Sequence, residues 1–142
     1  MVKQISVFVE NKKGRLARIT DVLGKGGIDL IALSIADTTN FGIMRCIVND
    51  PEKALKLLKE NDITASTTEV IVAEVVDKPG GLAYVLGLLD KADISVEYLY
   101  SFVRTPNENA LILFRVEEID RAVKTLEAGG VKLLDEKDIY EI

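Results

Sequence analysis

The amino-acid sequence predicts an α+β protein made of two tandem ferredoxin-like βαββαβ units, each a four-stranded antiparallel sheet of order 4-1-3-2 with two helices on one face. The first observation behind this prediction is an internal repeat, because residues 13–23 match residues 79–89 at an offset of 66 without a gap. The second is that hydrophobic periodicity changes between that of a strand and that of a helix in the same order in both halves. We therefore expect two domains, at residues 1–68 and 69–142.

The first two elements of each repeat are a strand and an amphipathic helix. Apolar and polar residues alternate over residues 4–10 and again over residues 71–75, as in a strand with one buried face. Apolar residues then recur at helical spacing over residues 16–23 and 82–89. In the first repeat the glycines of residues 24–27 should end the helix.

The remaining elements complete the βαββαβ order. Residues 28–37 and 41–49 predict a strand hairpin, residues 51–60 predict a helix, and a last strand follows. That helix matches residues 119–126 at an offset of 68, so the second repeat should follow the same course over residues 94–139. Right-handed crossovers in two interlocking β-α-β units then give the sheet order 4-1-3-2 with both helices on one face.

Composition narrows the class of protein. Apolar residues make up 48% and charged residues 29% of the chain, which is typical of a folded globular protein. No apolar run approaches the roughly 18 residues that span a bilayer, and the N-terminus becomes polar too early for a signal-peptide core. We expect a cytoplasmic protein without a membrane partner. The net charge of −5 argues against a nucleic-acid partner.

The residue types available for chemistry are few. The chain has no histidine, which is the commonest general base near neutral pH and the commonest metal ligand. Its one cysteine, Cys46, cannot form a disulfide within the chain or a cysteine-cluster metal site, and its place on a predicted strand favours burial. We therefore expect no catalytic activity, no catalytic residues, no metal and no cofactor.

The third strand of each repeat predicts self-association. Residues 43–48 and 110–116 are apolar at nearly every position, although only one face of the sheet is covered by helices in the expected fold. The opposite face should therefore be covered by something else. We expect a homo-oligomer, a dimer, in which sheet faces pack together.

The turns that follow the first strands carry a family resemblance. Residues 11–16 read Asn-Lys-Lys-Gly-Arg-Leu and residues 77–82 read Asp-Lys-Pro-Gly-Gly-Leu. Both resemble the ACT-domain signature Asn/Asp-x-Pro-Gly-x-Leu, which is followed by a Gly-hydrophobic-Asn/Asp-Ile segment. Residues 27–30 match that segment and residues 93–96 match it more loosely. The resemblance covers essentially the whole chain.

This resemblance implies a function and a site. ACT domains commonly bind amino acids at interfaces between paired domains and regulate biosynthetic enzymes, so it implies an amino-acid-binding regulatory protein that acts on an enzyme in trans. In serine-regulated phosphoglycerate dehydrogenases, which have a similar turn, contacts come from the turn and from the start of strand two in the adjoining domain. The histidine that precedes their turn corresponds here to Val9 and Val75. The ligand-binding residues that we predict are Asn11, Lys12, Lys13, Gly14, Arg15, Leu16, Asp29, Leu30, Asp77, Lys78, Pro79, Gly80, Gly81, Leu82, Ser95 and Val96.

The residues themselves suit an amino acid. The start of a helix offers backbone N–H groups and a positive dipole end, and Gly14 and Gly80 let a carboxylate approach the backbone there. Asn11 and Asp77 would then face the ammonium group. A purely structural interpretation stays open, since Asn and Asp also cap helices whatever a protein binds.

Two further features of these segments have structural interpretations. The leucines of the two turns, Leu16 and Leu82, are expected in the core rather than on a ligand. A basic cluster of Lys12, Lys13, Arg15 and Arg18 surrounds the first helix start. This cluster has two interpretations. It attracts an acidic ligand or a phosphate, or it pairs with the more acidic second repeat, and we favour the second interpretation.

Other proteins with this strand order fit the sequence poorly. A metallochaperone needs a CxxC motif, which the single cysteine cannot form. An RNA-recognition module needs several aromatic residues on its central strands, and the third strand has only Phe114 in the second repeat and none in the first. The stronger alternative is a protein-interaction and oligomerisation module that no longer binds a ligand. Because no catalytic or DNA-binding domain accompanies the two units, either function would require association with a separate chain.

Overall fold

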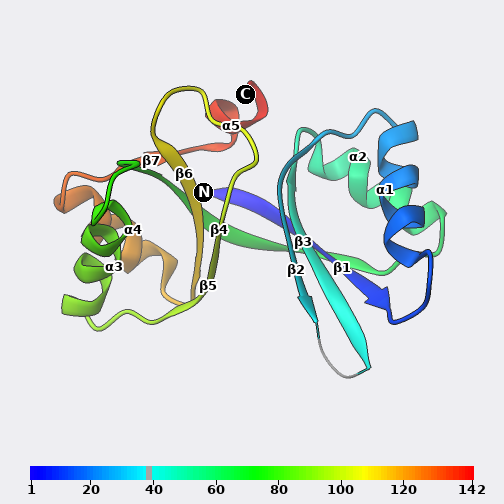
Figure 1. Cartoon of the computed structure of the whole chain (residues 1–142), viewed down its shortest axis with the longest axis horizontal. Coiled ribbons are helices and arrows are strands. Elements are labelled where there is room, and N and C mark those ends of the chain that lie inside the picture. Colours follow the sequence, from blue (N-terminus) through cyan, green and yellow to red (C-terminus); the bar gives the residue numbers. More distant parts are fainter. Residues whose placement is uncertain (38–39) are drawn as a thin grey trace. The chain divides into compact units, whose positions relative to one another are not determined.

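The structure is a computed structural model that describes residues 1–37 and 40–142. It contains two successive βαββαβ units, which confirms the predicted fold class, and a short fifth helix at the C-terminal end (Figure 1). The elements are β1 Val2–Glu10, α1 Arg15–Lys25, β2 Leu30–Asp37, β3 Phe41–Val48, α2 Pro51–Glu60, β4 Ala65–Val75, α3 Gly81–Lys91, β5 Val96–Ser101, β6 Ala110–Val116, α4 Ile119–Ala128, β7 Lys132–Leu134 and α5 Glu136–Tyr140.

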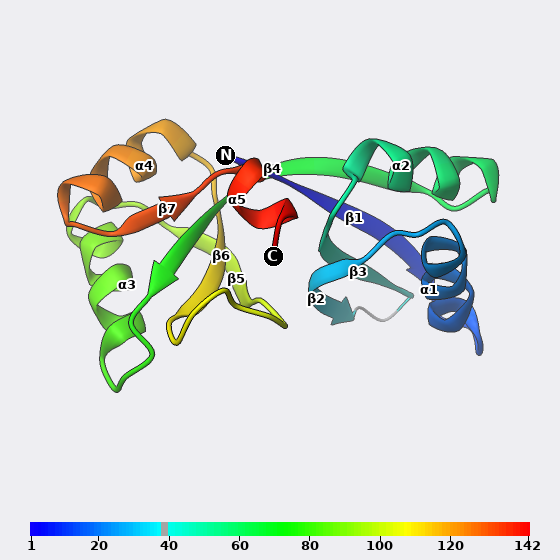
Figure 2. The same cartoon turned by 90° about the horizontal axis from the view of Figure 1, so that it is seen from above.

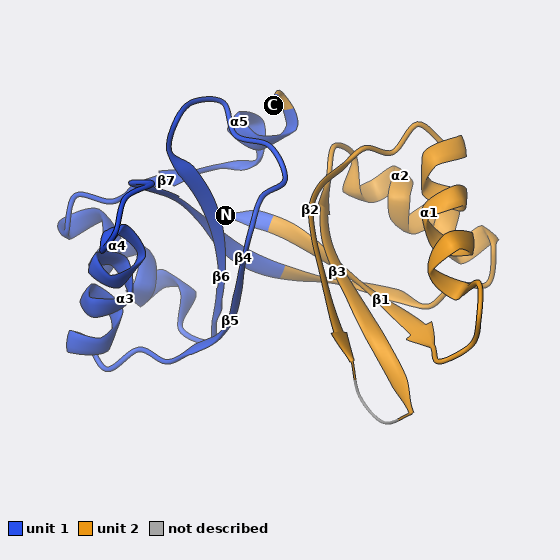
Figure 3. Ribbon diagram, in the orientation of Figure 1, with its two compact units in different colours: residues 1–2, 69–140, 142 blue, residues 3–68, 141 orange. Residues whose placement is uncertain are grey.

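The chain divides into two compact units (Figure 3). We call residues 3–68 with residue 141 the N-terminal unit, and residues 1–2, 69–140 and 142 the C-terminal unit. Strand β4 runs through both, because its residues up to Thr68 belong to the N-terminal unit and those from Glu69 to the C-terminal unit.

The strand order agrees with the prediction in both units. The N-terminal unit has the order β2-β3-β1-β4, and the C-terminal unit has the order β5-β6-β4 with β7 on the free side of β4. Ile5 of β1 lies opposite Cys46 of β3, and Ile71 of β4 lies opposite Phe114 of β6, so the central pairs keep the same register in the two repeats.

Each unit has its own hydrophobic core between its sheet and its helices. Helices α1 and α2 cover one face of their sheet, and α3 and α4 cover one face of theirs (Figures 1 and 2). Most of the apolar positions predicted from periodicity are buried, because each helix turns its apolar stripe toward the alternating residues of the strands. The fully buried members of the N-terminal core are Ile5, Val7, Met44, Cys46, Val48, Ala54, Leu23 and Leu58, and those of the C-terminal core include Ala73, Leu89, Phe114, Val116, Ala122 and Leu126.

The four long helices end in the same way. The residue after each C-cap has a positive φ, and the next residue donates its N–H back to the carbonyl five positions earlier, as in a Schellman motif. The glycines after α1 therefore end that helix as predicted. The positive-φ residues are Gly27 (φ 77°), Asp62 (57°), Asp93 (57°) and Gly130 (81°).

The end of the chain differs from the prediction. A strand was expected to continue toward residue 139, but β7 is only three residues long and α5 follows it. The N–H of Asp135 donates to Asp138 Oδ2 at 3.2 Å and the N–H of Asp138 donates to Asp135 Oδ1 at 3.1 Å. This reciprocal pair is a capping box, which starts a helix at the point where the strand would have continued.

The face of each sheet opposite the helices also carries apolar side chains. Ile47 on β3 and Leu111 and Leu113 on β6 point away from the helical cores, yet all three are buried within the single chain. In the C-terminal unit, α5 lies on this side of the sheet (Figures 1 and 2). The homo-oligomer stays a prediction.

Candidate functional site

Each predicted site begins with the turn between a unit's first strand and first helix. Gly14 and Gly80 are the N-cap residues of α1 and α3, with φ of 86° and 87°. L-residues rarely adopt this left-handed conformation. A Cβ added at either position would meet nothing within 4 Å. Glycine is therefore required by the backbone conformation, and the space in front of each turn is open.

The backbone of the two turns repeats at the offset of 66 residues. The N–H of Lys12 donates to the carbonyl of Glu10 at 2.7 Å, and the N–H of Lys78 donates to the carbonyl of Val76 at 2.9 Å. The N–H of Arg15 donates to the carbonyl of Lys12 at 3.3 Å, and the N–H of Gly81 donates to the carbonyl of Lys78 at 2.9 Å. The N–H groups that follow in the first turn of each helix have no acceptor within the helix, and they lie at the positive end of its dipole. Each turn thus presents donors and positive potential beside an open space.

The predicted capping residues do not occupy the N-cap position. Asn11 and Asp77 are three residues before the glycine that does, and both are exposed. In the usual cap, the side chain of the N-cap residue accepts from the first helical turn, and a glycine cannot do so. The ordinary N-cap interpretation of Asn11 and Asp77 is therefore wrong.

The second glycine of the C-terminal turn has a different role. A Cβ on Gly81 would lie 1.9 Å from the carbonyl oxygen of Val76, a distance that real structures do not show. The equivalent position in the N-terminal unit is Arg15, so that turn holds a large side chain where the C-terminal turn has room for none. The two turns are alike in conformation but unlike in packing and charge.

The leucines of the two turns differ as well. Leu82 is half-buried and packs on the C-terminal core, as expected. Leu16 is 39% exposed, so the expectation that it belongs to the core is wrong. Leu16 lies in the first turn of α1, three residues before the buried Ile19. Lys12, Lys13, Lys78 and Pro79 are exposed.

The starts of the second strands supply the other predicted contacts. The N–H of Asp29 donates to Asn49 Oδ1 at 2.9 Å, and the N–H of Asn49 donates to the carbonyl of Asp29 at 3.3 Å. This reciprocal pair fixes the backbone where β2 begins. Leu30 and Val96 pack on their cores, whereas Ser95 is exposed. Asn49 is a supporting residue that the sequence did not reveal, because its turn position carries no motif.

Within one unit the structure does not bring the turn and the second-strand start together. Glu10 at the end of β1 lies opposite Phe41, the first residue of β3, whereas Leu30 at the start of β2 lies opposite Val48, the last residue of β3. The two ends of the eight-residue strand β3 are seven steps apart, roughly 24 Å at about 3.4 Å per step. The C-terminal unit has the same arrangement, since Val75 and Val96 lie opposite the two ends of β6.

The basic cluster finds partners inside its own unit. Glu10 is 3.2 Å from Lys12 Nζ and 3.5 Å from Arg15 Nη2. The hydrogen bond from Lys12 and the charges of Arg15 and Lys12 lower the pKa of the Glu10 carboxyl. Arg18 Nη2 donates to the carbonyl of Asn61 at 2.8 Å. The prediction that this cluster pairs with the second repeat is therefore wrong for these three side chains.

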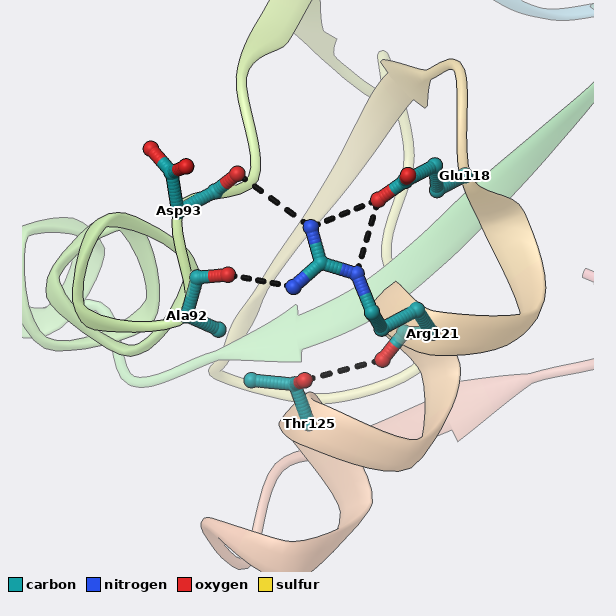
Figure 4. A network of polar contacts seen from close by, with 5 residues as sticks. All are labelled: Ala92, Asp93, Glu118, Arg121 and Thr125. Carbon is teal, nitrogen blue, oxygen red and sulfur yellow. Dashed lines mark hydrogen bonds and ion pairs between the residues drawn. The ribbon is translucent and has the colours of Figure 1, made fainter.

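Polar contacts between paired helix ends were also missed. Arg121 of α4 donates to the carbonyls of Ala92 and Asp93 at the end of α3, and its Nη2 is 2.6 Å from Glu118 Oε2 (Figure 4). Tyr84 Oη of α3 donates to the carbonyl of Gly129 at the end of α4 at 2.6 Å. These donors satisfy carbonyls that a helix end leaves without a partner. No short sequence motif marks them, since the partners are 28 to 45 residues apart.

Other chemistry is weakly represented in the described part of the chain. Residues 1–37 and 40–142 contain no group of three or more acidic, cysteine or histidine side chains that could hold a metal ion. No helix among them is long and apolar enough to cross a membrane. Cys46 is buried on β3, and burial raises the pKa of its thiol to about 12.

Comparisons with known proteins place the chain in a family. A model of the ACT domain pair matches residues 1–142. A solved structure of a protein from Bacteroides thetaiotaomicron is 42% identical, covers 99% of this chain and 96% of its own, and has a TM-score of 0.91. The ligand-free regulatory subunit of aspartate kinase from Thermus thermophilus is 15% identical, over 89% of this chain and 91% of that chain, with a TM-score of 0.63.

Aspartate kinase from Synechocystis is a further structural match, at 20% identity and a TM-score of 0.56, over 89% of this chain and 24% of that chain. At identities this low the likeness shows the fold alone. A search of curated protein sequences finds no match. The family model spans the chain from end to end, and the repeated glycine turns lie where each unit's first helix begins. The chain belongs to the ACT domain pair family.

Proposed function

We propose that this ACT domain pair is a regulatory protein that binds a small amino acid between ACT-like units and acts by associating with a separate enzyme. The observation that carries the proposal is the pair of open turns. At Gly14 and Gly80 the backbone is held in a left-handed conformation beside unobstructed space, and helical N–H groups lie next to it. That arrangement suits the carboxylate of an amino acid.

The ligand site in this proposal needs two units. Within one unit the turn and the second-strand start lie at opposite ends of the sheet, so one unit cannot supply both. We propose that a turn from one unit meets Asp29 with Leu30, or Ser95 with Val96, from another. Asn11 or Asp77 would then face the ammonium group, since both are exposed on the turn.

We further propose that the protein regulates rather than catalyses, works in the cytoplasm, and forms a homodimer. The absence of histidine and the buried, high-pKa thiol of Cys46 support a non-catalytic function. The Thermus thermophilus structure is of a regulatory subunit of an enzyme. By analogy with that arrangement, we propose that a biosynthetic enzyme is the partner in trans.

A second candidate function is an interaction and oligomerisation module without a ligand. It is favoured by the edge strand β2, where Leu33 and Ile35 are 39% and 49% exposed. An edge strand with exposed apolar side chains is a template for pairing with another chain. The two functions differ in one measurable property, which is whether an amino acid stabilises the folded protein.

The test is thermal unfolding of the full chain in the presence of each of the twenty amino acids. A ligand at 100 times its Kd stabilises the folded state by about 2.7 kcal/mol, so one amino acid or a few should raise the Tm by several degrees. Gly80→Val and Gly14→Val should abolish the shift at the affected turn, and Gly87→Ala in the middle of α3 should keep it. A flat response to all twenty would contradict the proposal and favour the interaction module.

A further inference from the structure

We propose that the N-terminal unit carries a second binding site, for the carboxylate of a small organic acid with an aliphatic body, in a groove on the α2 side of α1. The groove has a volume of about 620 Å³. It lies between the end of β1, the first turns of α1 and the loop from α2 to β4. Its lining residues are Phe8, Val9, Glu10, Arg15, Arg18, Ile19, Asn61, Asp62, Ile63 and Thr64, all in the N-terminal unit.

Two arginine side chains line this groove. Arg15 and Arg18 are three residues apart on α1, so both project from the same side of the helix. Arg18 is held by its hydrogen bond to the carbonyl of Asn61, and Arg15 by its contact with Glu10. A guanidinium has five N–H donors, and these contacts leave most of them available. Side chains already held in place lose less conformational entropy when a ligand binds.

The charge around the groove favours a single carboxylate. Glu10 and Asp62 also line it and balance the two arginines, but Lys12 is paired with Glu10 and the N-terminal end of α1 is positive. Glu10 is engaged by Lys12 at 3.2 Å, and its lowered pKa reports the positive surroundings. The excess of positive charge is small, which suits a monoanion better than a phosphate dianion.

Four of the other lining residues are apolar. Val9 and Ile19 form the buried floor, Ile63 is half-buried, and Phe8 is 50% exposed at the edge. An aliphatic chain attached to the carboxylate would cover these side chains and remove apolar surface from water. An inorganic anion would leave them uncovered. The lining therefore selects an organic acid.

The site belongs to one repeat only. At the positions equivalent to Arg15 and Arg18, the C-terminal unit has Gly81 and Tyr84, neither of which is charged at neutral pH. Tyr84 instead donates to the carbonyl of Gly129. The groove is complete within one unit and shares Arg15 with the amino-acid site proposed above. Arg18 distinguishes the two sites, because it is not part of the turn.

The experiment is an NMR titration of the uniformly ¹⁵N-labelled full chain with isovalerate. We expect saturable shifts at the amides of Arg18, Ile63 and Thr64. Isovaleramide has the same body without the charge and should cause none, and inorganic phosphate should bind more weakly than isovalerate. Saturation by isovaleramide, tighter binding of phosphate, or no saturable shift with isovalerate would each overturn the proposal.

Substitutions of the two arginines test whether isovalerate binds in this groove. Arg18→Gln and Arg15→Gln should each weaken isovalerate binding by about tenfold, as expected for loss of a charge-assisted hydrogen bond. Arg15→Gln keeps the bond from Arg18 to Asn61, so it stays informative if Arg18→Gln unfolds. Lys56→Gln removes the same charge from exposed α2 and should bind like the parent chain. Arg18→Gln should also leave any amino-acid thermal shift unchanged, and unaltered isovalerate binding in both arginine variants would refute the site.

Discussion

Gly130 and Gly87 lie in the same unit, and a Cβ at either position would meet nothing within 4 Å, yet alanine should have opposite effects at the two. Gly130 follows α4 with φ 81°, in the left-handed region. Alanine there costs about 1–2 kcal/mol, offset by about 0.4–1 kcal/mol from the less flexible unfolded chain. The net expectation is a loss of about 1 kcal/mol. Gly87 lies within α3, where alanine is favoured by about 1 kcal/mol.

The assay is urea unfolding followed by tyrosine emission. The chain has no tryptophan, and every tyrosine lies in the C-terminal unit, so this signal reports on the unit that carries both substitutions. The tyrosines are Tyr84, Tyr98, Tyr100 and Tyr140. Unfolding free energies of Gly130→Ala and Gly87→Ala should differ by about 2 kcal/mol, in the stated directions.

A further variant separates backbone conformation from the loss of a glycine. Asp93 after α3 also has a positive φ, of 57°, so Asp93→Gly should be neutral or stabilising because it relieves the left-handed strain. The reasoning would be refuted if Gly130→Ala were as stable as the parent chain. It would also be refuted if Gly87→Ala lowered the urea midpoint of unfolding by as much as Gly130→Ala does.

Three other predictions follow from single contacts. Gly81→Ala should destabilise the C-terminal unit by more than Gly130→Ala in the same urea assay, because its Cβ meets the carbonyl of Val76 at 1.9 Å; equal effects would contradict this. Arg121→Ala should lower the unfolding free energy by about 1 kcal/mol, because the carbonyls at the end of α3 lose their donor. Arg121→Lys should recover only part of that stability, and full recovery would show that charge alone matters. The Cys46 thiol should not react with a thiol reagent until the protein unfolds. Burial raises the pKa of this thiol from 9.0 to about 12 in the folded state, so its contribution to stability is complete below pH 9 and is lost as pH rises from 9 toward 12. The unfolding free energy of Cys46→Val should therefore fall less steeply with pH in this range than that of the parent chain. Equal slopes for the two proteins would count against burial of the thiol.

Local sequence patterns predicted the elements and the turns well. The strand alternation around Ile5 and Ile71 and the helical spacing around Leu23 and Leu89 depend on which side of one element is buried, and that is decided by neighbouring residues. The glycine turns were recognised for the same reason. A left-handed N-cap needs glycine wherever it occurs.

Contacts between distant segments were not predictable in this way. The exposure of Leu16, the pairing of Lys12 and Arg15 with Glu10, and the bond from Arg18 to Asn61 depend on how α1 is rotated on its sheet and where α2 ends. The short helix α5 was missed because a reciprocal pair of aspartates, Asp135 and Asp138, outweighed the strand expected from the repeat.

The sequence by itself determined the tandem fold, the sheet order and the family, because periodicity and turn chemistry are repeated in register along the chain. Only the tertiary structure decided that the turn and the second-strand start of one unit lie at opposite ends of β3. It alone placed Arg15 and Arg18 beside the loop from α2 to β4. The physical reason is that residues far apart in the chain become neighbours only when the helices pack on the sheet, and that packing fixes the direction of every side chain.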